Sequence, residues 1–249
     1  MKEADVLKRF SNPLTSPAIP GCRHRFNRRD HLYITYRTDW EALRNAVPEP
    51  LELLEEPLVR FEVMRMPDAT GFGDYTECGQ AIPVGFRGER GEYLHMMYLD
   101  NFEATAAGRE CNAYPKKWGF PKFFVDGDTL VGTLDYGPSR MRVATATMTY
   151  KFFPMDMEEA RKEICSPNYM LKLQPHYDGT PRIAELIRTQ TSDCEILEAW
   201  TGDARLQLFD HVNCPLNDLP VREIVSCCHI LTNLTLGRSR MVYDYLHKD

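Results

Sequence analysis

The sequence predicts a strand-rich α+β fold built on a curved antiparallel sheet with few short helices. Most of the chain divides into short segments rich in β-branched and aromatic residues, separated by turn residues. No glycine-rich loop opens a helix after a strand, which disfavours dinucleotide-binding and P-loop folds. Many short strands with few helices favour a closed or heavily curved antiparallel sheet.

The first half of the chain combines two helical patterns with a series of strands. A short amphipathic helix is expected within residues 1–10, followed by an extended segment. Thr38 and Glu41 fit a capping box and Pro48 ends the pattern, which predicts a second helix. Alternating segments predict strands over residues 31–37, 57–66, 75–86 and 91–100.

The second half contains one convincing helix, over residues 155–165, among many strands. Its β-branched and alternating segments predict strands over residues 128–137, 140–153, 169–176, 182–190, 194–200, 204–209, 228–236 and 241–246. The 249 residues are enough for one sizeable core, and we expect a single domain over 1–249.

Composition and charge exclude several classes of function. The net charge of -6 argues against a nucleic-acid partner. The charged N-terminus lacks the apolar core of a signal peptide, and no apolar run reaches the length of a membrane span, so we expect a soluble cytoplasmic protein. The 8 cysteines form no CxxC pair, so we expect reduced thiols and no metal site.

Strand geometry and a basic segment suggest where charged groups could meet. In the strand over 57–66, Val59 and its alternate neighbours share one face, while Glu62 shares the other with Arg60 and Met64. Glu62, like Glu77 in "YTECG", is therefore either an exposed strand acid or a cavity acid. The segment "RHRFNRRD" needs only one inward arginine to form an entrance that guides anions.

The stretch "AYPKKWGFPK" places Lys116 and Lys117 among prolines and aromatic residues. They form either a solvated charge pair or a reactive amine with its neighbour. A free lysine has a pKa of about 10.4, whereas imine formation needs the neutral amine. If the segment is extended, the two side chains point to opposite sides, so we expect burial of Lys116 to favour the neutral amine more than repulsion by Lys117. A bent backbone, with repulsion dominant, is the alternative.

The stretch "GRECNAYPKKWGFPK" resembles the signature of the acetoacetate decarboxylase family. The blocks "LTSPAIP", "EPLVRFEVM", "YTECGQAIPV", "YLHMMYLDN", "FVDGDTLVGTLDYG" and "PLNDLPVREIVS" resemble it in the same order, over essentially the whole chain. This family is a standard example of an activated lysine nucleophile. The resemblance implies a barrel-like domain, a dodecameric homo-oligomer and no cofactor.

The resemblance also implies the reaction and its residues. The family decarboxylates acetoacetate, a β-keto acid, to acetone and CO2 through a lysine Schiff base, as a carboxy-lyase. By position, Lys116 corresponds to the Schiff-base lysine and Lys117 to its neighbour, Arg29 to the active-site arginine, and Glu62 and Glu77 to the two acids.

Further roles follow from the chemistry of this reaction. We expect Arg29 to guide the substrate, and Glu77, less surely Glu62, to handle the proton. A glutamate should pair with Arg29 or be protonated, because an ionised acid touching the amine opposes its activation. Expected pocket walls are Tyr114, Met97 and Phe26.

Two other functions fit the same residues. A related lysine enzyme could carry out aldol or dehydration chemistry on another keto acid. A non-catalytic barrel could bind a small carbonyl compound or acid without turning it over.

Overall fold

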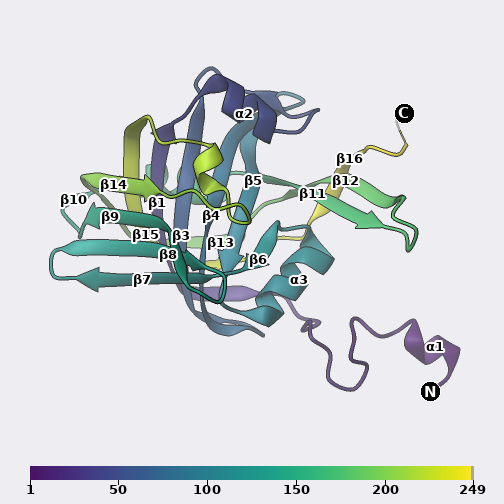
Figure 1. The fold of residues 1–249 in the computed structure, drawn as a ribbon. Helices are drawn as coiled ribbons and strands as arrows, with labels where there is room; N and C mark the ends of the chain where they lie inside the picture. The colour runs from purple at the N-terminus through teal and green to yellow at the C-terminus, as the bar shows by residue number, and fades with distance from the viewer. Residues whose placement is uncertain (248–249) are drawn as a thin grey trace.

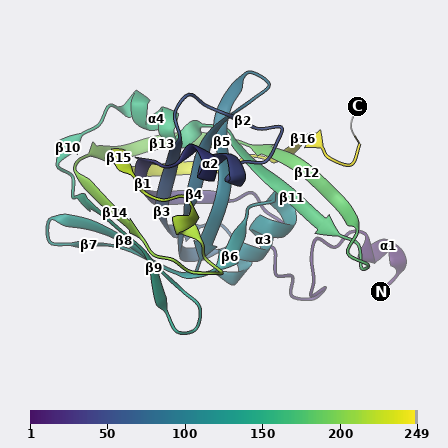
Figure 2. The same cartoon turned by 45° about the horizontal axis from the view of Figure 1, so that its top comes forward.

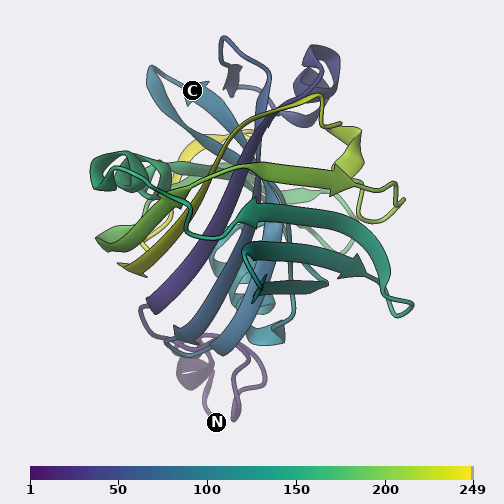
Figure 3. The same ribbon diagram turned by 90° about the vertical axis from the view of Figure 1, so that its left-hand side faces the viewer.

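The computed structural model describes residues 1–247, and the last two residues of the predicted domain lie outside this range. Two sheets carry the fold, one of 12 strands and one of 4. Figures 1 and 3 show the smaller sheet lying across one face of the larger one. Its strands are β7 (Phe120–Asp126), β8 (Thr129–Tyr136), β9 (Met141–Thr149) and β14 (Ala204–Leu208).

The larger sheet is mostly antiparallel, with the long strands at its centre. The central order is β13-β15-β1-β3-β4-β5, in which β1, β15 and β3 pair antiparallel. Two short partners, β6 and β11, run parallel to β5. The strands of this sheet are β1 (Arg25–Arg37), β2 (Glu52–Leu53), β3 (Leu58–Ala69), β4 (Gly73–Phe86), β5 (Glu89–Leu99), β6 (Lys116–Trp118), β10 (Phe153–Pro154), β11 (Asn168–Pro175), β12 (Pro181–Thr189), β13 (Ser192–Thr201), β15 (Glu223–Thr235) and β16 (Arg240–Asp244).

The main hydrophobic core lies between the two sheets. Val63 of β3 and Leu134 of β8 are both fully buried in it. A Cβ at Gly132 would come within 2.7 Å of the Val63 side chain, so glycine allows the sheets to approach closely there. As alternation predicts, Val59, Phe61 and Val63 join this core, which leaves the other face of β3 for polar side chains.

The helices are short: α1 (Glu3–Val6), α2 (Trp40–Ala46), α3 (Phe102–Asn112) and α4 (Met157–Cys165), with a 3-10 turn η1 (Leu216–Asp218). The helices α2, α3 and α4 lie around the larger sheet, whereas α1 lies apart from it near the N-terminus (Figures 1 and 2). The α3 helix lies beside β6 in both views (Figures 1 and 2). No helix within residues 1–247 is long and apolar enough to cross a bilayer.

The strand-rich α+β prediction is confirmed, and its details need three corrections. The sheets are curved but do not close into a barrel, and the parallel pairings of β6 and β11 with β5 depart from an antiparallel sheet. The capping box is wrong: Asp39, not Thr38, is the N-cap of α2, and no side-chain bond caps that helix. The sequence patterns also missed α3 and β7.

The missed helix has physical reasons to escape detection. Asn101 caps α3 by accepting a bond from the Ala104 amide at 2.8 Å, but the helix has Gly108 in its interior and no clear apolar stripe. It ends at Ala113, which adopts a left-handed φ of 71° where glycine is usual. The asparagine cap is a normal start signal, but the interior glycine, the weak apolar stripe and the lack of a glycine at the end hide the rest of the helix.

Candidate active site

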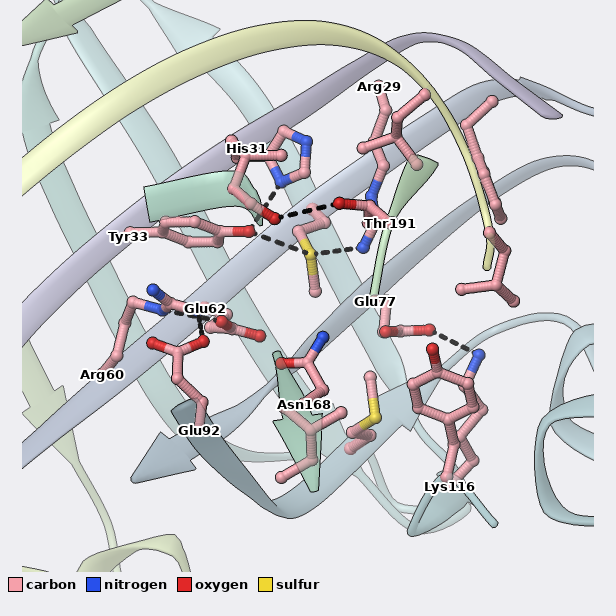
Figure 4. A pocket seen from close by; sticks show the side chains of 18 of the residues that line it. Arg29, His31, Tyr33, Arg60, Glu62, Glu77, Glu92, Lys116, Asn168 and Thr191 are labelled. Atoms are coloured by element: carbon pink, nitrogen blue, oxygen red, sulfur yellow. Dashed lines mark hydrogen bonds and ion pairs between the residues drawn. The ribbon is translucent and has the colours of Figure 1, made fainter. Parts of the chain in front are cut away.

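Three adjacent strands present polar side chains to the face of the large sheet opposite the main core. Alternate residues of β1, β3 and β4 point the same way, which brings together side chains far apart in sequence. They enclose a cavity of about 70 Å³ (Figure 4). The strands contribute Arg29, His31 and Tyr33, then Arg60, Glu62 and Met64, then Tyr75 and Glu77.

A bulge in β1 turns Arg29 into this pocket. Phe26 and Arg29 are three residues apart, so a regular strand would place them on opposite faces, yet both line the cavity. The β1–β15 register gains one residue between them, and Arg28 has a left-handed φ of 53°. A matching bulge in β3, between Met66 and Ala69, keeps β1 and β3 in step.

The end of α3 and the strand β6 position Lys116. After the left-handed turn at Ala113, the chain folds back so that the Tyr114 amide donates to the Gly108 carbonyl at 3.0 Å. Arg109 donates to the Lys116 carbonyl at 2.9 Å. The Lys116 side chain then lies across Gly108, where a Cβ would come within 2.6 Å of its Cδ.

Lys116 and Glu77 form a buried pair at one end of the pocket (Figure 4). Lys116 Nζ lies 2.9 Å from Glu77 Oε2, and the two residues are only 8% and 2% exposed. The amine also lies 5.1 Å from the centre of the Tyr114 ring and 6.0 Å from that of Tyr75. Burial raises the pKa of both tyrosines, so their hydroxyls stay protonated and can donate hydrogen bonds.

Lys117 points away from the pocket. Within β6 the two lysines alternate, as expected for an extended segment, and Lys117 Nζ donates to the Asn213 carbonyl at 2.6 Å on the other side. Its amine lies 5.1 Å from the centre of the Tyr136 ring. The bent-backbone alternative, with one ammonium beside the other, is therefore wrong.

Arg29 is a cation without an anionic partner. Among the described residues it forms no ion pair; its Nη2 contacts Met64 Sδ at 2.8 Å, and its buried Nε has no hydrogen-bond partner. Burial opposes its charge, but neighbours that include Tyr33 and Glu77 leave its pKa above the ordinary arginine value. The expected pairing of Arg29 with a glutamate is therefore wrong, because Glu77 binds Lys116 and Glu62 binds Arg60.

Arg60 gathers carboxylates at the opposite end of the pocket (Figure 4). Its Nε donates to Glu62 at 2.8 Å, and its other nitrogens bind Glu92 and reach Glu163 at 3.3 Å. Burial raises the pKa of Glu92 to about 8, against the opposing effect of Arg60. Glu62 is thus a cavity acid, but it lies away from the Lys116 amine.

His31 is a neutral hydrogen-bonding group in the wall of the pocket. Its Nδ1 lies 2.9 Å from the Tyr33 hydroxyl and its Nε2 lies 3.0 Å from Thr232 Oγ1. Burial, together with Arg29 and Arg60, holds the pKa of His31 well below its usual range. The pocket therefore combines neutral donors and acceptors with two separate charged clusters.

Comparison with known proteins identifies the family. A family model described as acetoacetate decarboxylase (ADC) matches residues 11–246. The chain belongs to the acetoacetate decarboxylase family. The acetoacetate decarboxylase of Clostridium botulinum (strain Eklund 17B / Type B) is 62% identical over 248 residues, covering 100% of both chains.

Solved structures of the acetoacetate decarboxylase family have the same fold. One, described as structural studies of acetoacetate decarboxylase, matches with a TM-score of 0.97 and 60% identity over 99% of this chain and 100% of that one. Acetoacetate decarboxylase from Legionella pneumophila matches with a TM-score of 0.91 and 41% identity, covering 97% and 96% of the two chains.

The pocket gathers most of the residues that the acetoacetate decarboxylase signature singled out. Lys116 and Glu77 touch, while Arg29 lines the same cavity and Glu62 lies at its far end. The expected wall residues also line it; they are Tyr114, Met97 and Phe26. Lys117 is the exception, because it is absent from the lining and bonds elsewhere.

Sequence reasoning overlooked several lining residues that share the pocket. They are His31, Tyr33, Arg60, Tyr75, Glu92, Asn168 and Thr191. For the strand residues the signal was present: His31 and Tyr33 follow Arg29 at a spacing of two, and Arg60 precedes Glu62 by two. Asn168 and Thr191 sit at strand ends far along the chain, where no local pattern points to the pocket.

Proposed function

We propose that this protein decarboxylates acetoacetate to acetone and CO2 through an imine on Lys116. The observation that carries the proposal is the buried Lys116–Glu77 pair, in a pocket that also holds the unpartnered Arg29. Full-length relatives named acetoacetate decarboxylase, at 61–62% identity, support the same reaction. These names do not favour the aldolase, dehydratase or binding-protein alternatives.

The reaction needs an electron sink, which the lysine supplies. The neutral Lys116 amine attacks the ketone, and loss of water gives a cationic iminium. The bond to the carboxylate then breaks, CO2 leaves, and its electron pair forms an enamine with the iminium nitrogen. Protonation of the enamine carbon and hydrolysis of the iminium release acetone and return the free amine.

Glu77 is placed to move the proton that activates Lys116. A separation of 2.9 Å lets the proton lie on either partner. Burial penalises the two charges of an ion pair, so transfer to Glu77 creates a neutral amine beside a neutral acid without leaving a lone buried charge. Proton transfer to Glu77 therefore replaces burial of an isolated ammonium as the proposed way to activate Lys116. The same transfer produces the protonated glutamate that the chemistry requires.

Arg29 supplies the attraction for the substrate anion. An unpartnered guanidinium in a small pocket favours a carboxylate, which can accept its unused N–H donors. Tight clamping in the ground state would stabilise the carboxylate that must be lost, so the useful contribution is to position it. When the carboxylate leaves as neutral CO2, its electron pair neutralises the iminium, and no anion remains for Arg29 to attract.

Reductive trapping tests the proposed imine directly. Borohydride added during turnover of acetoacetate should attach the substrate carbon skeleton to Lys116, located by peptide mass spectrometry. Lys116→Arg should abolish CO2 release and trapping, because a guanidinium does not form this imine. Lys122→Arg, an exposed lysine in β7, is the matched control and should keep both.

Two results would contradict the proposal. One is CO2 release by Lys116→Arg at the wild-type rate. The other is acetoacetate that binds the wild-type protein reversibly with neither trapping nor CO2 release, which would favour a binding protein. From the family resemblance we further propose a cofactor-independent cytoplasmic enzyme that assembles as a dodecamer.

A further inference from the structure

Three other cavities each share one wall residue with the pocket around Lys116. A cavity of about 470 Å³ shares Leu236, one of about 300 Å³ shares Tyr33, and one of about 410 Å³ shares Tyr75. Each is a candidate route between the reacting amine and solvent. The charges that line the three cavities differ sharply, so a negatively charged substrate is attracted to some of them and repelled by others.

The cavity behind Leu236, which we call the basic vestibule, has only basic residues among its charged lining side chains. Its charged or titratable nitrogen groups are Arg23, His24 and Arg238, and no carboxylate lines it. Neither arginine has an ion pair within residues 1–247, although the whole chain carries a net charge of -6.

The other two cavities are poor paths for an anion. The cavity behind Tyr33 is lined by Asp156, Glu159 and Glu163 and by no basic residue. The cavity behind Tyr75 balances Arg65 and Lys122 against Asp74 and Asp100, and Arg65 is already paired with Asp74 at 3.1 Å. Both tyrosine walls are buried, whereas Leu236 is half-buried.

Leu236 forms a thin wall between the vestibule and the pocket. It is the first residue after β15, and its amide donates to the His24 carbonyl at 2.9 Å. Beyond it, a Cβ at Gly237 would lie 1.8 Å from the Gln190 carbonyl oxygen, so the backbone is fixed against its neighbour. The leucine side chain lines both cavities and packs against two hydrophobic clusters, so its size and rotamer decide how closed this wall is.

We propose that the basic vestibule is the entrance for the substrate carboxylate, with Arg23 and Arg238 as capture residues and Leu236 as the gate to Lys116. The inference rests on the proposed function, because it assumes an anionic β-keto acid. Clefts lined by one sign of charge raise the local concentration and association rate of an opposite charge. The products acetone and CO2 are neutral, so the vestibule does not retain them.

Neutralising the vestibule tests the capture residues. Arg23→Gln combined with Arg238→Gln should lower kcat/KM for acetoacetate on the order of tenfold at low salt, and this loss should shrink as salt screens the charges. The kcat at saturating substrate should remain, as should borohydride trapping of neutral acetone on Lys116. Arg182→Gln with Arg205→Gln removes two exposed arginines elsewhere and is the matched control.

Changing the wall tests the route itself. Leu236→Trp should slow acetoacetate turnover and acetone trapping together, because a larger side chain narrows the passage for charged and neutral compounds alike. Leu236→Met, similar in volume, should keep near wild-type rates. Circular dichroism and the melting temperature establish that each variant is folded.

The outcomes separate this proposal from the proposed function. Unchanged kcat/KM and salt dependence in the double arginine variant, or unimpeded turnover in a folded Leu236→Trp variant, would overturn the entrance. Failure of wild-type protein to trap acetoacetate on Lys116 would instead overturn the decarboxylase mechanism.

Discussion

At the scale of single residues, Glu77 carries two opposing effects on Lys116. Its carboxylate stabilises the ammonium through a contact of 2.9 Å, and the same oxygen is the nearest acceptor for the proton that must leave. Which effect dominates depends on the substrate, because the incoming carboxylate brings a further negative charge into a buried space.

Glu77→Gln tests the proton-transfer role. The amide keeps the size of the side chain but cannot accept the ammonium proton, so we expect kcat to fall by about 10²–10⁴. The fall should be accompanied by slower trapping of neutral acetone, since amine activation precedes both reactions. Rapid-quench borohydride trapping measures that step apart from CO2 release.

Stability measurements separate the chemical from the structural role of the pair. Removing one partner of a buried ion pair costs about 3–5 kcal/mol, whereas replacing both can be neutral. Glu77→Gln and Lys116→Met should therefore each lower the free energy of unfolding more than the double variant does. Additive losses in denaturant titrations would show that the two side chains do not act as a pair.

The sequence predicted which side chains share the pocket better than it predicted their partners. Lys116, Glu77 and Arg29 were found because motifs marked them, and the opposite orientation of Lys117 followed from strand alternation. The partner of Glu77 was not predictable, because it depends on how β6 and β4 lie relative to each other. Glu62 meets Arg60 rather than Arg29, and this pairing was within reach of the sequence, because the two residues share one face of β3 at a spacing of two.

At the scale of elements, α3 shapes the site although its sequence gave little sign of a helix. Gly108 leaves the space in which the Lys116 side chain lies, and the left-handed turn at Ala113 returns the chain toward it. The strand β6 then fixes which of the two lysines faces the pocket. One helix end and a three-residue strand thus select which lysine faces the pocket as the proposed nucleophile.

Gly108→Ala tests this contact between helix and lysine. Its methyl group would lie 2.6 Å from Lys116 Cδ, so the flexible side chain must move away from Glu77. We expect kcat to fall at least tenfold without loss of folding, because alanine otherwise favours a helix interior by about 0.5–1 kcal/mol. Steady-state kinetics with a thermal melt measure both.

A control on the same helix distinguishes crowding from a change in helix stability. Glu110→Ala, on an exposed position of α3, also raises helix propensity but adds nothing near the lysine. It should keep wild-type kcat. Equal activity in both variants would mean that the position of Lys116 does not depend on Gly108.

Strands could be predicted from the sequence where apolar and polar residues alternate strongly, and they were missed where the alternation is interrupted. The long central strands overlapped their predicted segments, although β1 begins six residues and β15 five residues earlier than predicted. The strand β7 was missed because it begins beside Gly119 and Pro121, which suggested a break in the chain. Parallel pairing of β6 with β5 was also hidden, because such a short strand carries no period of its own. Closure of the sheet depends on strand number and curvature, which alternation does not encode.

At the scale of the whole molecule, the two faces of the large sheet have different tasks. One face packs against the smaller sheet and supplies most of the apolar burial. The other holds Arg60 with two buried carboxylates, together with the Lys116–Glu77 pair. Concentrating ionisable groups on one side makes the stability of the entire fold sensitive to pH.

Glu92 determines the direction in which stability changes with pH. Its pKa rises from the ordinary 4.5 to about 8 in the folded protein, so folding favours the protonated acid. The stabilisation is fully present below the unfolded pKa and is lost as pH rises through the folded value. Between about pH 4.5 and 8 the free energy of unfolding therefore falls as the pH rises.

Glu92→Gln should remove this contribution. The free energy of unfolding, measured by urea titration at several pH values, should decline less steeply over that window than in wild type. Glu52→Gln, at an exposed acid of β2, should keep the wild-type slope. Parallel curves for wild type and Glu92→Gln would contradict a protonated Glu92.

The paired bulges in β1 and β3 also constrain how the gene can change. Each strand carries one surplus residue relative to its outer neighbour, β15 or β4, while the two strands stay aligned with each other. Losing a codon from one segment alone would slide the two strands past each other and displace Arg29. Insertions and deletions near residues 27 and 67 should therefore be inherited together, as compensating events.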